Sequence, residues 1–381
     1  MASSFDPKEL VKGYEKNELT IAVIGSHSAL EIARGAKDES IHSLVVCQKG
    51  RDKTYSKHYL NRQRKGVEGT VGCVDEVIIL DQFSDLVSED IMKDLRIKAA
   101  IFVPNRSFCV YVPYQDIETR FSIPIFGNRY LLRAEERDEA WNQYTLMKEA
   151  GIRTPRRFEK PSDIHQLAIV KASEAQRKYE RAFFFASNEK EFEEKSANLL
   201  KEKRATEEGI QNAVIEEVIL GAQFNFNFFY SPLHQEIELM GIDMRRQTNL
   251  DGLLRLPAAQ QLEVMKHVPV NHIEVGHVAS TIRESLLEKA FAAAERLVAA
   301  AKKAKPPGII GPFALQGAIT SEEGHEDLVV FDLSLRVPGS PGIAATPYSY
   351  YLNGKRVSIG RRIAQEVKLA MEKERLHEIV T

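Results

Sequence analysis

Residues 312–336 have the sequence PFALQGAITSEEGHEDLVVFDLSLR, which predicts two strands joined by an acidic turn. Because side chains alternate between the two faces of a strand, Asp332, Ser334 and Arg336 share one face of the second strand. Gln316 lies on the polar side of the first strand, and pairing of the strands would bring it near Asp332. Two oxygen ligands beside an arginine suit Mg²⁺ that bridges nucleotide phosphates. The pattern alone also fits an amphipathic hairpin with a solvated face.

The composition is that of a soluble globular protein. With 381 residues the chain has room for two or three packed units and a large core. Its net charge of −2 produces no field that would draw it to nucleic acid or to an acidic membrane. No apolar run approaches the roughly 18 residues that a membrane span needs. The first residues, MASSFDPKELVKGYEKNE, lack the apolar core of a signal peptide, so we expect a cytoplasmic protein.

The three cysteines, Cys47, Cys73 and Cys109, are isolated from one another in the sequence. Without a CxxC spacing they favour neither a disulfide framework nor a cysteine-ligated zinc site. We expect them to be buried free thiols, which fits a reducing cytoplasm.

The N-terminal third predicts a parallel α/β unit. The continuous apolar run LTIAVIG at 19–25 is typical of a strand buried on both faces of a parallel sheet. A helix predicted at 26–39 and the strand HSLVVCQ at 42–48 complete a βαβ unit. Further strands predicted at 74–80 and 99–105 extend the sheet.

Polar side chains follow two of these strands at their carboxyl ends, SHS after the first and NRS after the fourth. Ligands of open parallel sheets bind beyond these ends, and a helix N-terminus there favours phosphate. The sequence therefore predicts that His27, Ser28 and Ser107 line one anionic pocket. The alternative for His27 is a helix-capping role without a ligand.

After residue 131 the chain predicts antiparallel strands and charged helices. The expected elements are a helix at 133–150, two strands within 167–187, a charged helix at 188–209, strands within 213–232 and 237–246, a helix at 284–308, the hairpin, an irregular loop at 336–355 and one or two closing helices. A short helix is also expected at 6–18, and a basic loop at 49–69. Lys171 ends the first strand of the 167–187 pair, where it would matter only with a nucleotide phosphate above it.

Eight separate stretches of the sequence resemble those of one family. In chain order they are GSHSALEIARGAKDE, PIFGNR, AVIEEVILG, FFYSP, GIDMRRQTNLDG, PPGIIGPFALQ, PYSYYLNGK and GRRIAQEVK. In this order they resemble the archaeal 5-formaminoimidazole-4-carboxamide ribonucleotide synthetases, over nearly the whole chain. The resemblance implies an α/β protein with an ATP-grasp fold, preceded by a parallel α/β, Rossmann-like domain. We expect a substrate-binding domain at 1–130, a small ATP-grasp subdomain at 131–222 and a large one with the metal site at 223–381.

The resemblance also implies a reaction. Such enzymes use ATP and formate to formylate 5-aminoimidazole-4-carboxamide ribonucleotide late in purine synthesis, through formyl phosphate and without folate. The implied cofactors are ATP and Mg²⁺, with Mn²⁺ as a substitute. The expected partners are these small molecules, with neither nucleic acid nor membrane, and a homo-oligomer stays open.

The resemblance implies roles for particular residues. Gln316 and Asp332 would bind the metal. Arg336 would stabilise the transferring phosphoryl group, and Lys171 would contact the ATP phosphates. The adenosine would be bordered by Glu216 and Glu217, and the ribonucleotide would be held by His27, Ser107 and Asn249.

The chain departs from the family pattern near the phosphates and the substrate. The loop after Lys171 is SEAQRKYER, which lacks the family's glycines, and its charges at Arg177, Lys178 and Arg181 could substitute for a backbone cradle. A histidine of the family's PHGS motif is absent from PNRS at 104–107, Asp332 stands where glutamate is usual, and PGSPG follows Arg336. Two alternatives therefore stay open: an ATP-grasp ligase for another acid and amine, and a nucleotide-binding protein without ligase activity.

Overall fold

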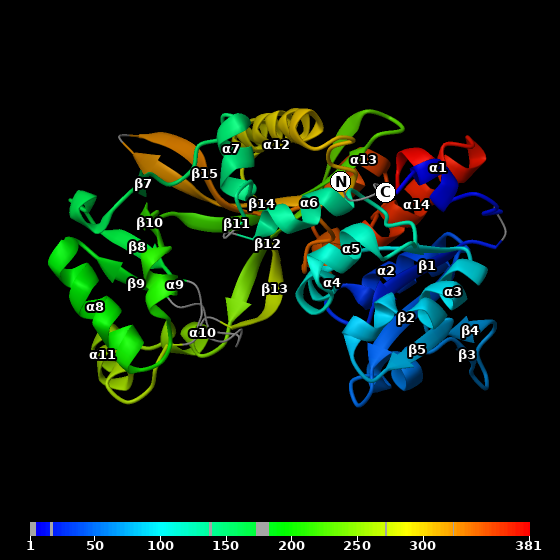
Figure 1. Cartoon of the computed structure of the whole chain (residues 1–381), viewed down its shortest axis with the longest axis horizontal. Coiled ribbons are helices and arrows are strands. Elements are labelled where there is room, and N and C mark those ends of the chain that lie inside the picture. Colours follow the sequence, from blue (N-terminus) through cyan, green and yellow to red (C-terminus); the bar gives the residue numbers. More distant parts are fainter. Residues whose placement is uncertain (1–4, 16–17, 137–138, 173–182, 271–272, 323) are drawn as a thin grey trace.

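The computed structural model describes residues 5–15, 18–136, 139–172, 183–270, 273–322 and 324–381. Within these residues three main sheets follow one another along the chain (Figure 1). We name them the first, second and third sheet. No helix in the described part of the chain has the length and apolar character needed to cross a membrane.

The first sheet is parallel, with the strand order β5-β2-β1-β6. Its strands are β1 (Thr20–Ile24), β2 (His42–Gln48), β5 (Glu76–Leu80) and β6 (Ala100–Phe102). Every residue of β1 is buried, as the continuous apolar run predicts for a strand covered on both faces. The helices of this lobe are α2 (Ala29–Asp38), α3 (Glu89–Ile97), α4 (Arg106–Tyr111) and α5 (Tyr114–Thr119). The predicted parallel unit is confirmed, with shorter strands.

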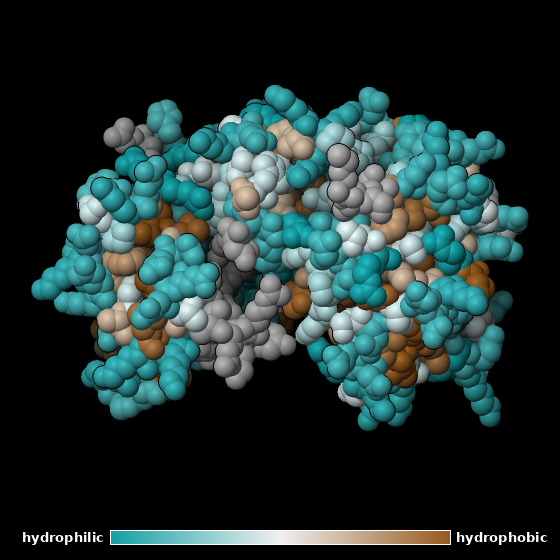
Figure 2. All heavy atoms as spheres, in the orientation of Figure 1, coloured by the Kyte–Doolittle hydropathy of each residue, from teal (hydrophilic) through white to brown (hydrophobic). Residues whose placement is uncertain are grey.

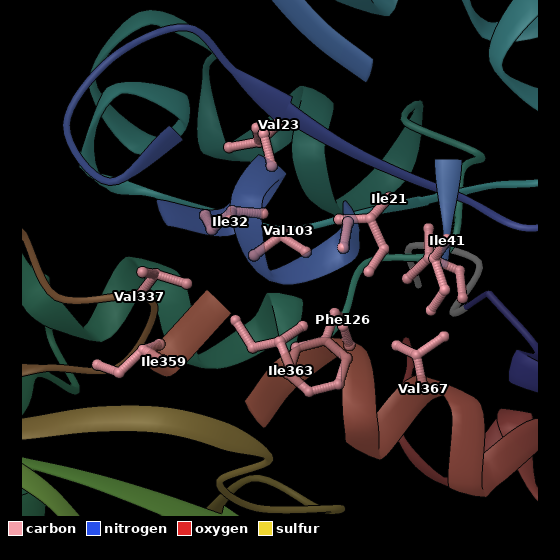
Figure 3. Close-up of a cluster of buried hydrophobic side chains, with 14 of the residues drawn as sticks. Ile21, Val23, Ile32, Ile41, Val103, Phe126, Val337, Ile359, Ile363 and Val367 are labelled. Atoms are coloured by element: carbon pink, nitrogen blue, oxygen red, sulfur yellow. The ribbon is translucent and has the colours of Figure 1, made fainter. Parts of the chain in front are cut away.

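The last long helix of the chain, α14 (Ile359–Glu372), packs against the first sheet through α2. Its apolar side chains Ile359, Ile363 and Val367 face those of the first sheet and of α2 in one buried cluster (Figure 3). Two glycines lie where the helices cross. A Cβ atom on Gly360 would lie 2.1 Å from the carbonyl oxygen of Glu31, so the two backbones are in direct contact.

The chain end extends the same lobe. Val380 bridges Phe126, and the backbone of Thr381 exchanges two hydrogen bonds with that of Ile125. The buried guanidinium of Arg129 donates to the carbonyl oxygens of Ile117, Phe121, Ile123 and Thr381. Residues near 125 and residues 379–381 are thus held together by one hydrogen-bonded network.

The α2–α14 contact also buries the Glu31 carboxylate, which leads to a prediction. Burial raises the pKa of Glu31 to about 7, and the backbone N–H of Ile359 opposes only part of this effect. Between pH 4.5 and pH 7 the unfolded chain has lost the proton that the folded chain keeps, so stability falls as the pH rises. We expect Glu31→Gln to remove this loss, which amounts to about 3 kcal/mol at most for a shift of this size.

The measurement is the denaturant midpoint at several values between pH 4.5 and 8. Glu39, the C-cap residue that directly follows α2, provides the matched control. Burial alone would raise its pKa, but the hydrogen bonds from Arg361 and Gln365 and the charges of Arg361 and Lys368 hold that pKa below its usual value. Glu39→Gln should therefore destabilise the protein above its carboxylate pKa. Equal pH profiles for the wild type and Glu31→Gln would show that Glu31 is not buried as a carboxyl group.

The second sheet is antiparallel, with the strand order β7-β10-β8-β9. Its strands are β7 (Arg157–Phe158), β8 (Ala168–Lys171), β9 (Phe183–Ala186) and β10 (Val214–Glu217), and its helices are α8 (Glu189–Lys201) and α9 (Glu207–Gln211). The predicted strand pair is confirmed. The charged helix expected at 188–209 is shorter, since α8 ends at Lys201 and α9 follows it. Phe192 of α8 packs in the core of this sheet. The glycine-free stretch SEAQRKYER, with Arg177, Lys178 and Arg181, lies outside the described residues.

The third sheet is antiparallel, with the strand order β13-β12-β11-β14-β15. Its strands are β11 (Ala222–Ser231), β12 (Glu236–Gln247), β13 (Glu274–Ser280), β14 (Gly311–Glu322) and β15 (His325–Ser334). One face packs under α12 (Glu284–Ala304) and α7 (Gln143–Glu149), with Phe226, Phe228 and Leu297 in the shared core. The predicted hairpin is confirmed: Gln316 and Asp332 are register partners, and a β-bulge follows Gln316.

Some predicted elements were wrong. The helix expected at 133–150 is interrupted, because Asn142 caps a new helix by accepting from the N–H groups of Tyr144 and Thr145. The N-terminal helix is only α1 (Pro7–Leu10), and the irregular loop after Arg336 contains α13 (Tyr348–Asn353). The remaining elements are α6 (Arg129–Leu132), α10 (Leu250–Leu253), α11 (Ala258–Met265), β3 (Arg62–Gln63) and β4 (Thr70–Val71), the last two within the basic segment.

Candidate functional site

The polar face of the third sheet has a buried carboxylate at its centre. Asp243 of β12 is fully buried, and its oxygens accept from the side-chain amides of Asn225 and Asn227 at 2.7 Å each. His277 of β13 lies 2.5 Å from the same carboxylate through Nδ1. Burial alone would raise the pKa of Asp243, but these hydrogen bonds hold it below its usual value. The site therefore contains a fixed negative charge.

His277 lies between two carboxylates. Its Nε2 is 2.8 Å from Oε1 of Glu274, while Nδ1 contacts Asp243, and the side chain is only 6% exposed. Burial alone would lower the pKa of His277, but hydrogen bonds to Asp243 and Glu274 raise it to about 9. His277 is therefore an imidazolium at neutral pH and donates to both partners.

Sequence reasoning missed His277 and Glu274 for a structural reason. Strict strand alternation places positions 274 and 277 on opposite faces. In the structure the register between β12 and β13 shifts between Arg246 and Gln247, so that Arg246 pairs with Gly276 and Gln247 with Glu274. This irregularity brings both side chains to one face. The only signal in the sequence was an unexplained histidine in a short polar segment.

His27 approaches this cluster from the first sheet. It lies in the turn between β1 and α2, and its ring centroid is 5.7 Å from that of His277. Burial lowers the pKa of His27, Glu274 opposes this effect, and His277 and Arg336 add to it. His27 is therefore a neutral imidazole next to a charged one. His27 is not the N-cap of α2, because Ser28 occupies that position.

The two predicted serines lie at the same edge of the first sheet. Ser107 donates from Oγ to Oγ of Ser26 at 2.5 Å, which brings together the carboxyl ends of β1 and β6. The buried Ser28 donates to the carbonyl oxygen of Pro338 at 2.8 Å. Ser28 thus connects the first sheet to the segment after Arg336, while Ser107 stays beside the His27 turn.

Asn105 and Arg106 replace residues of the family pattern, and both have structural partners. The amide of Asn105 donates to the carbonyl oxygens of Ile24 and His27 at 2.9 and 3.3 Å, so it supports the His27 turn. Arg106 forms an ion pair with Glu136 at 3.1 Å. The altered strand end is therefore well ordered around the same turn.

Arg336 lies at the end of the hairpin, where Glu135 and the backbone of Val337 bind part of its guanidinium. Its Nη2 lies 3.2 Å from Glu135, and its Nη1 donates to the carbonyl oxygen of Val337. The other carboxylate oxygen of Glu135 accepts from the backbone N–H of Leu335. The Nε of Arg336 is buried and has no hydrogen-bond partner among the described residues. A buried, unsatisfied cationic donor is costly, which favours an anionic ligand at this position.

The predicted metal ligands lie on adjacent strands. Gln316 donates to Oγ of Ser334 at 3.0 Å, and its amide oxygen accepts from Arg245. Asp332 is half-buried opposite Gln316. Since a carbonyl oxygen has two lone pairs, Gln316 can keep Arg245 and still face a cation. One carboxylate and one amide oxygen fit Mg²⁺, which usually takes its other ligands from phosphates and water.

Lys171 and Glu216 form an ion pair in the second sheet. Lys171 Nζ lies 2.6 Å from Oε2 of Glu216, whose side chain is 1% exposed. Oε1 of Glu216 is buried without a hydrogen-bond partner among the described residues. Glu217, the next residue of β10, accepts from Gln166 at 3.5 Å. The structure therefore brings Lys171 and Glu216 together at the edge where ATP is expected.

Asn249 lies elsewhere on the third-sheet lobe. It precedes α10, and its side-chain amide donates to the carbonyl oxygen of Pro269 at 2.8 Å. The residue that contacts His27 from this lobe is His277. The role of Asn249 in substrate binding stays a prediction, as do the other residue roles inferred from the resemblance.

The molecular surface has a hollow between two parts of the chain. Figure 2 shows this hollow between the lobe of the second sheet and that of the first, in the orientation of Figure 1. His27 and Ser107 belong to the first sheet's lobe, and Lys171 and Glu216 to the second sheet. The third sheet, with Asp332, connects the two lobes.

Comparison with known proteins gives matches over the full chain. A family described as a protein of unknown function (DUF1246) matches residues 21–158, and a domain of unknown function (DUF1297) matches residues 191–381. A 5-formaminoimidazole-4-carboxamide-1-(beta)-D-ribofuranosyl 5'-monophosphate synthetase of Methanocaldococcus jannaschii is 39% identical over 383 residues, with 100% of both chains covered.

Two solved structures are similar to this one. An IMP biosynthesis protein, PurP, from Thermococcus kodakaraensis has a TM-score of 0.68 at 27% identity, covering 95% of this chain and 100% of that chain. An N5-carboxyaminoimidazole synthetase from Staphylococcus aureus complexed with ADP has a TM-score of 0.55 at 13% identity, covering 92% of this chain and 76% of that chain. The second likeness concerns the fold alone.

Proposed function

Because the chain belongs to the family of archaeal 5-formaminoimidazole-4-carboxamide ribonucleotide synthetases, we propose that it uses ATP and formate to formylate 5-aminoimidazole-4-carboxamide ribonucleotide. It is an ATP-dependent carbon–nitrogen ligase with an ATP-grasp fold, as its structural neighbours are. The reaction belongs to purine biosynthesis and yields the formamido ribonucleotide. ATP phosphorylates formate to formyl phosphate, the 5-amino group attacks the formyl carbon, and phosphate leaves.

One observation carries this proposal. The strand-end turn of the first sheet and the polar face of the third sheet meet, with the His27 and His277 rings 5.7 Å apart. Formyl phosphate is an activated acyl group that water would destroy. A site in which the amine substrate and the phosphorylation centre lie side by side lets the amine react before water does.

The phosphorylation half of the site lies around the hairpin. In our proposal Gln316 and Asp332 hold Mg²⁺, or Mn²⁺ in its place, which neutralises charge on the ATP phosphates when bound. The buried Nε of Arg336 donates to the phosphoryl group during transfer, and Glu135 keeps the guanidinium in position. Lys171 contacts the ATP phosphates, and Glu216 and Glu217 border the adenosine.

The ribonucleotide half lies around His27. We propose that His27 and Ser107 hold this substrate, and that Ser28 shapes their turn by its bond to Pro338. The imidazolium of His277 adds positive charge that suits an anionic ligand, and its two carboxylate partners keep it protonated. Asn249, which precedes α10 in the third-sheet lobe, remains a candidate for binding the ribonucleotide. We further propose the three-domain division at residues 130 and 222. The helix α14 follows residue 222 in the sequence but packs on α2 of the first domain.

A coupled assay tests the proposed function. The protein is incubated with ATP, Mg²⁺, formate and the ribonucleotide, and ADP and the formamido product are measured together. ADP release that requires both formate and the ribonucleotide is the expected result. ADP release with a different acid or amine would favour a ligase with other substrates. ATP binding without turnover would favour a nucleotide-binding protein without ligase activity.

His27→Ala is expected to raise the KM for the ribonucleotide by about tenfold or more, with a smaller change in kcat. The reason is that our proposal places the ribonucleotide at His27 and ATP at the hairpin. The KM for ATP should stay near the wild-type value. His42→Ala is the matched control, because His42 begins β2 at the opposite end of the first sheet. An unchanged KM for the ribonucleotide would exclude His27 from its binding site.

A further inference from the structure

Three side chains of the kinds that bind metals lie close together where the lobe of the first sheet meets the third sheet. One ligand atom each of His27, Glu274 and His277 lies within 4.8 Å of the other two. His27 comes from the first sheet's lobe, and the other two come from β13. Two imidazoles and one carboxylate form the ligand set of many zinc enzymes, with a fourth position left open. The oxygen-only pair of Gln316 and Asp332 is chemically different and suits harder cations.

Outer hydrogen bonds orient both histidines for such a role. Asp243 contacts Nδ1 of His277, and Asn225 and Asn227 in turn hold Asp243. A carboxylate on the far nitrogen of a metal-binding histidine fixes its tautomer and raises its affinity. His27 is hydrogen-bonded to the backbone of Gly339. Both ring nitrogens of His277 have protein partners, Asp243 at Nδ1 and Glu274 at Nε2, so a metal ion on this residue would enter between Nε2 and Glu274.

Two carboxylates flank the imidazole of His277. His277 contacts the carboxylates of Asp243 and Glu274, and Arg245 lies 2.9 Å from the second of these. In the structure a proton on His277 bridges the two carboxylates. A metal ion on Nε2 would replace that proton and keep the contact with Glu274.

We propose that His27, Glu274 and His277 form a binding site for Zn²⁺ and similar transition-metal ions, distinct from the Gln316–Asp332 pair. Zinc–ligand distances near 2.0–2.1 Å require ligand atoms about 3.4 Å apart. The three ligand atoms of this cluster already lie within 4.8 Å of one another. His27 belongs to the lobe of the first sheet, and β13 belongs to the third sheet. A bound ion would therefore link these two parts of the molecule. A second consequence rests on the proposed function: the ion excludes the ribonucleotide from His27.

Direct titration tests the site without any substrate. Metal-free protein is titrated with Co²⁺, whose tetrahedral complexes absorb strongly in the visible range, and then with Zn²⁺ as a competitor. One Co²⁺ per chain with a tetrahedral spectrum, displaced by Zn²⁺ but not by millimolar Mg²⁺, is the expected result. A featureless octahedral spectrum, or displacement by Mg²⁺, would overturn the proposal.

Variants assign the signal to these residues. His27→Ala, Glu274→Gln and His277→Asn should each weaken Co²⁺ binding at least tenfold. His27→Ala is the safest of them, because this exposed turn residue adds little to the core. His42→Ala is the control and should bind as the wild type does. Unchanged affinity in the His27 variant would overturn the site, whatever the other variants do.

A kinetic arm tests the consequence for the enzyme. Zn²⁺ should raise the KM for the ribonucleotide and leave the KM for ATP unchanged, and a chelator should reverse the effect. Inhibition competitive with ATP would contradict the assigned location. If no ligase activity is found, the titration alone still decides whether the metal site exists, so the two proposals fail separately.

Discussion

Asp332→Asn is expected to lower turnover by a factor on the order of a hundred or more, because the metal site that we propose would lose its carboxylate ligand. Asparagine keeps the size and the strand position of aspartate, and Gln316 would still lie opposite in the register. What is lost is the negative charge that holds a divalent cation against the ATP phosphates. The measurement is kcat at saturating substrates, together with the Mg²⁺ concentration that gives half-maximal rate, which should rise.

Asp327→Asn supplies the matched control on the same strand. Asp327 lies near the turn of the hairpin, where it forms an ion pair with Arg153 at 3.0 Å. It loses the same charge as the test variant but lies five positions away along β15. Its turnover should match that of the wild type. If Asp332→Asn also keeps the wild-type rate and Mg²⁺ dependence, the metal does not bind at this hairpin.

Gly360→Ala is expected to cause the largest loss of stability. The added Cβ would lie 2.1 Å from the Glu31 carbonyl oxygen and 2.7 Å from the Cα of Ile32, and both are backbone atoms that no rotamer change can move. Overpacking usually costs about 1–3 kcal/mol, and a clash with backbone belongs at or above the upper end. Either α14 moves away from α2 or the sheet beneath it shifts. The denaturant midpoint should fall clearly.

Gly252→Ala is the control for this substitution. Gly252 is also in a helix, α10, but a Cβ there would meet nothing within 4 Å. Alanine is the better helix former, so the midpoint should stay the same or rise slightly. A wild-type midpoint for Gly360→Ala would mean that the two helices do not cross in direct contact.

The parts of the fold that could be predicted depend on local patterns. A continuous apolar run predicts a strand covered on both faces, and β1 is such a strand. Alternation in the hairpin predicts which side chains share a face, and the pairing of Gln316 with Asp332 follows from it. The resemblance to the synthetase family, spread over separate stretches, is confirmed by full-length identity.

The parts that could not be predicted depend on contacts between distant residues or on irregular backbone. Nothing near Gly360 indicates that its partner is Gly35, because the contact joins the two ends of the chain. The cluster around His277 depends on a register shift, which reverses the face that alternation assigns to Glu274. Polar residues in turns, such as Asn249, were easier to notice than a histidine inside an unrecognised strand.

The packing of α14 on the first sheet has a consequence for the order of synthesis. Arg129 is translated 252 residues before Thr381, whose carbonyl oxygen it binds in the finished protein. Until the ribosome has made the last helix, the apolar faces of α2 and Ile21 have no cover from α14. The N-terminal lobe therefore lacks part of its buried core through most of translation, which leaves apolar surface uncovered. The first sheet and α14 can complete their shared core only after the segment between them has been made.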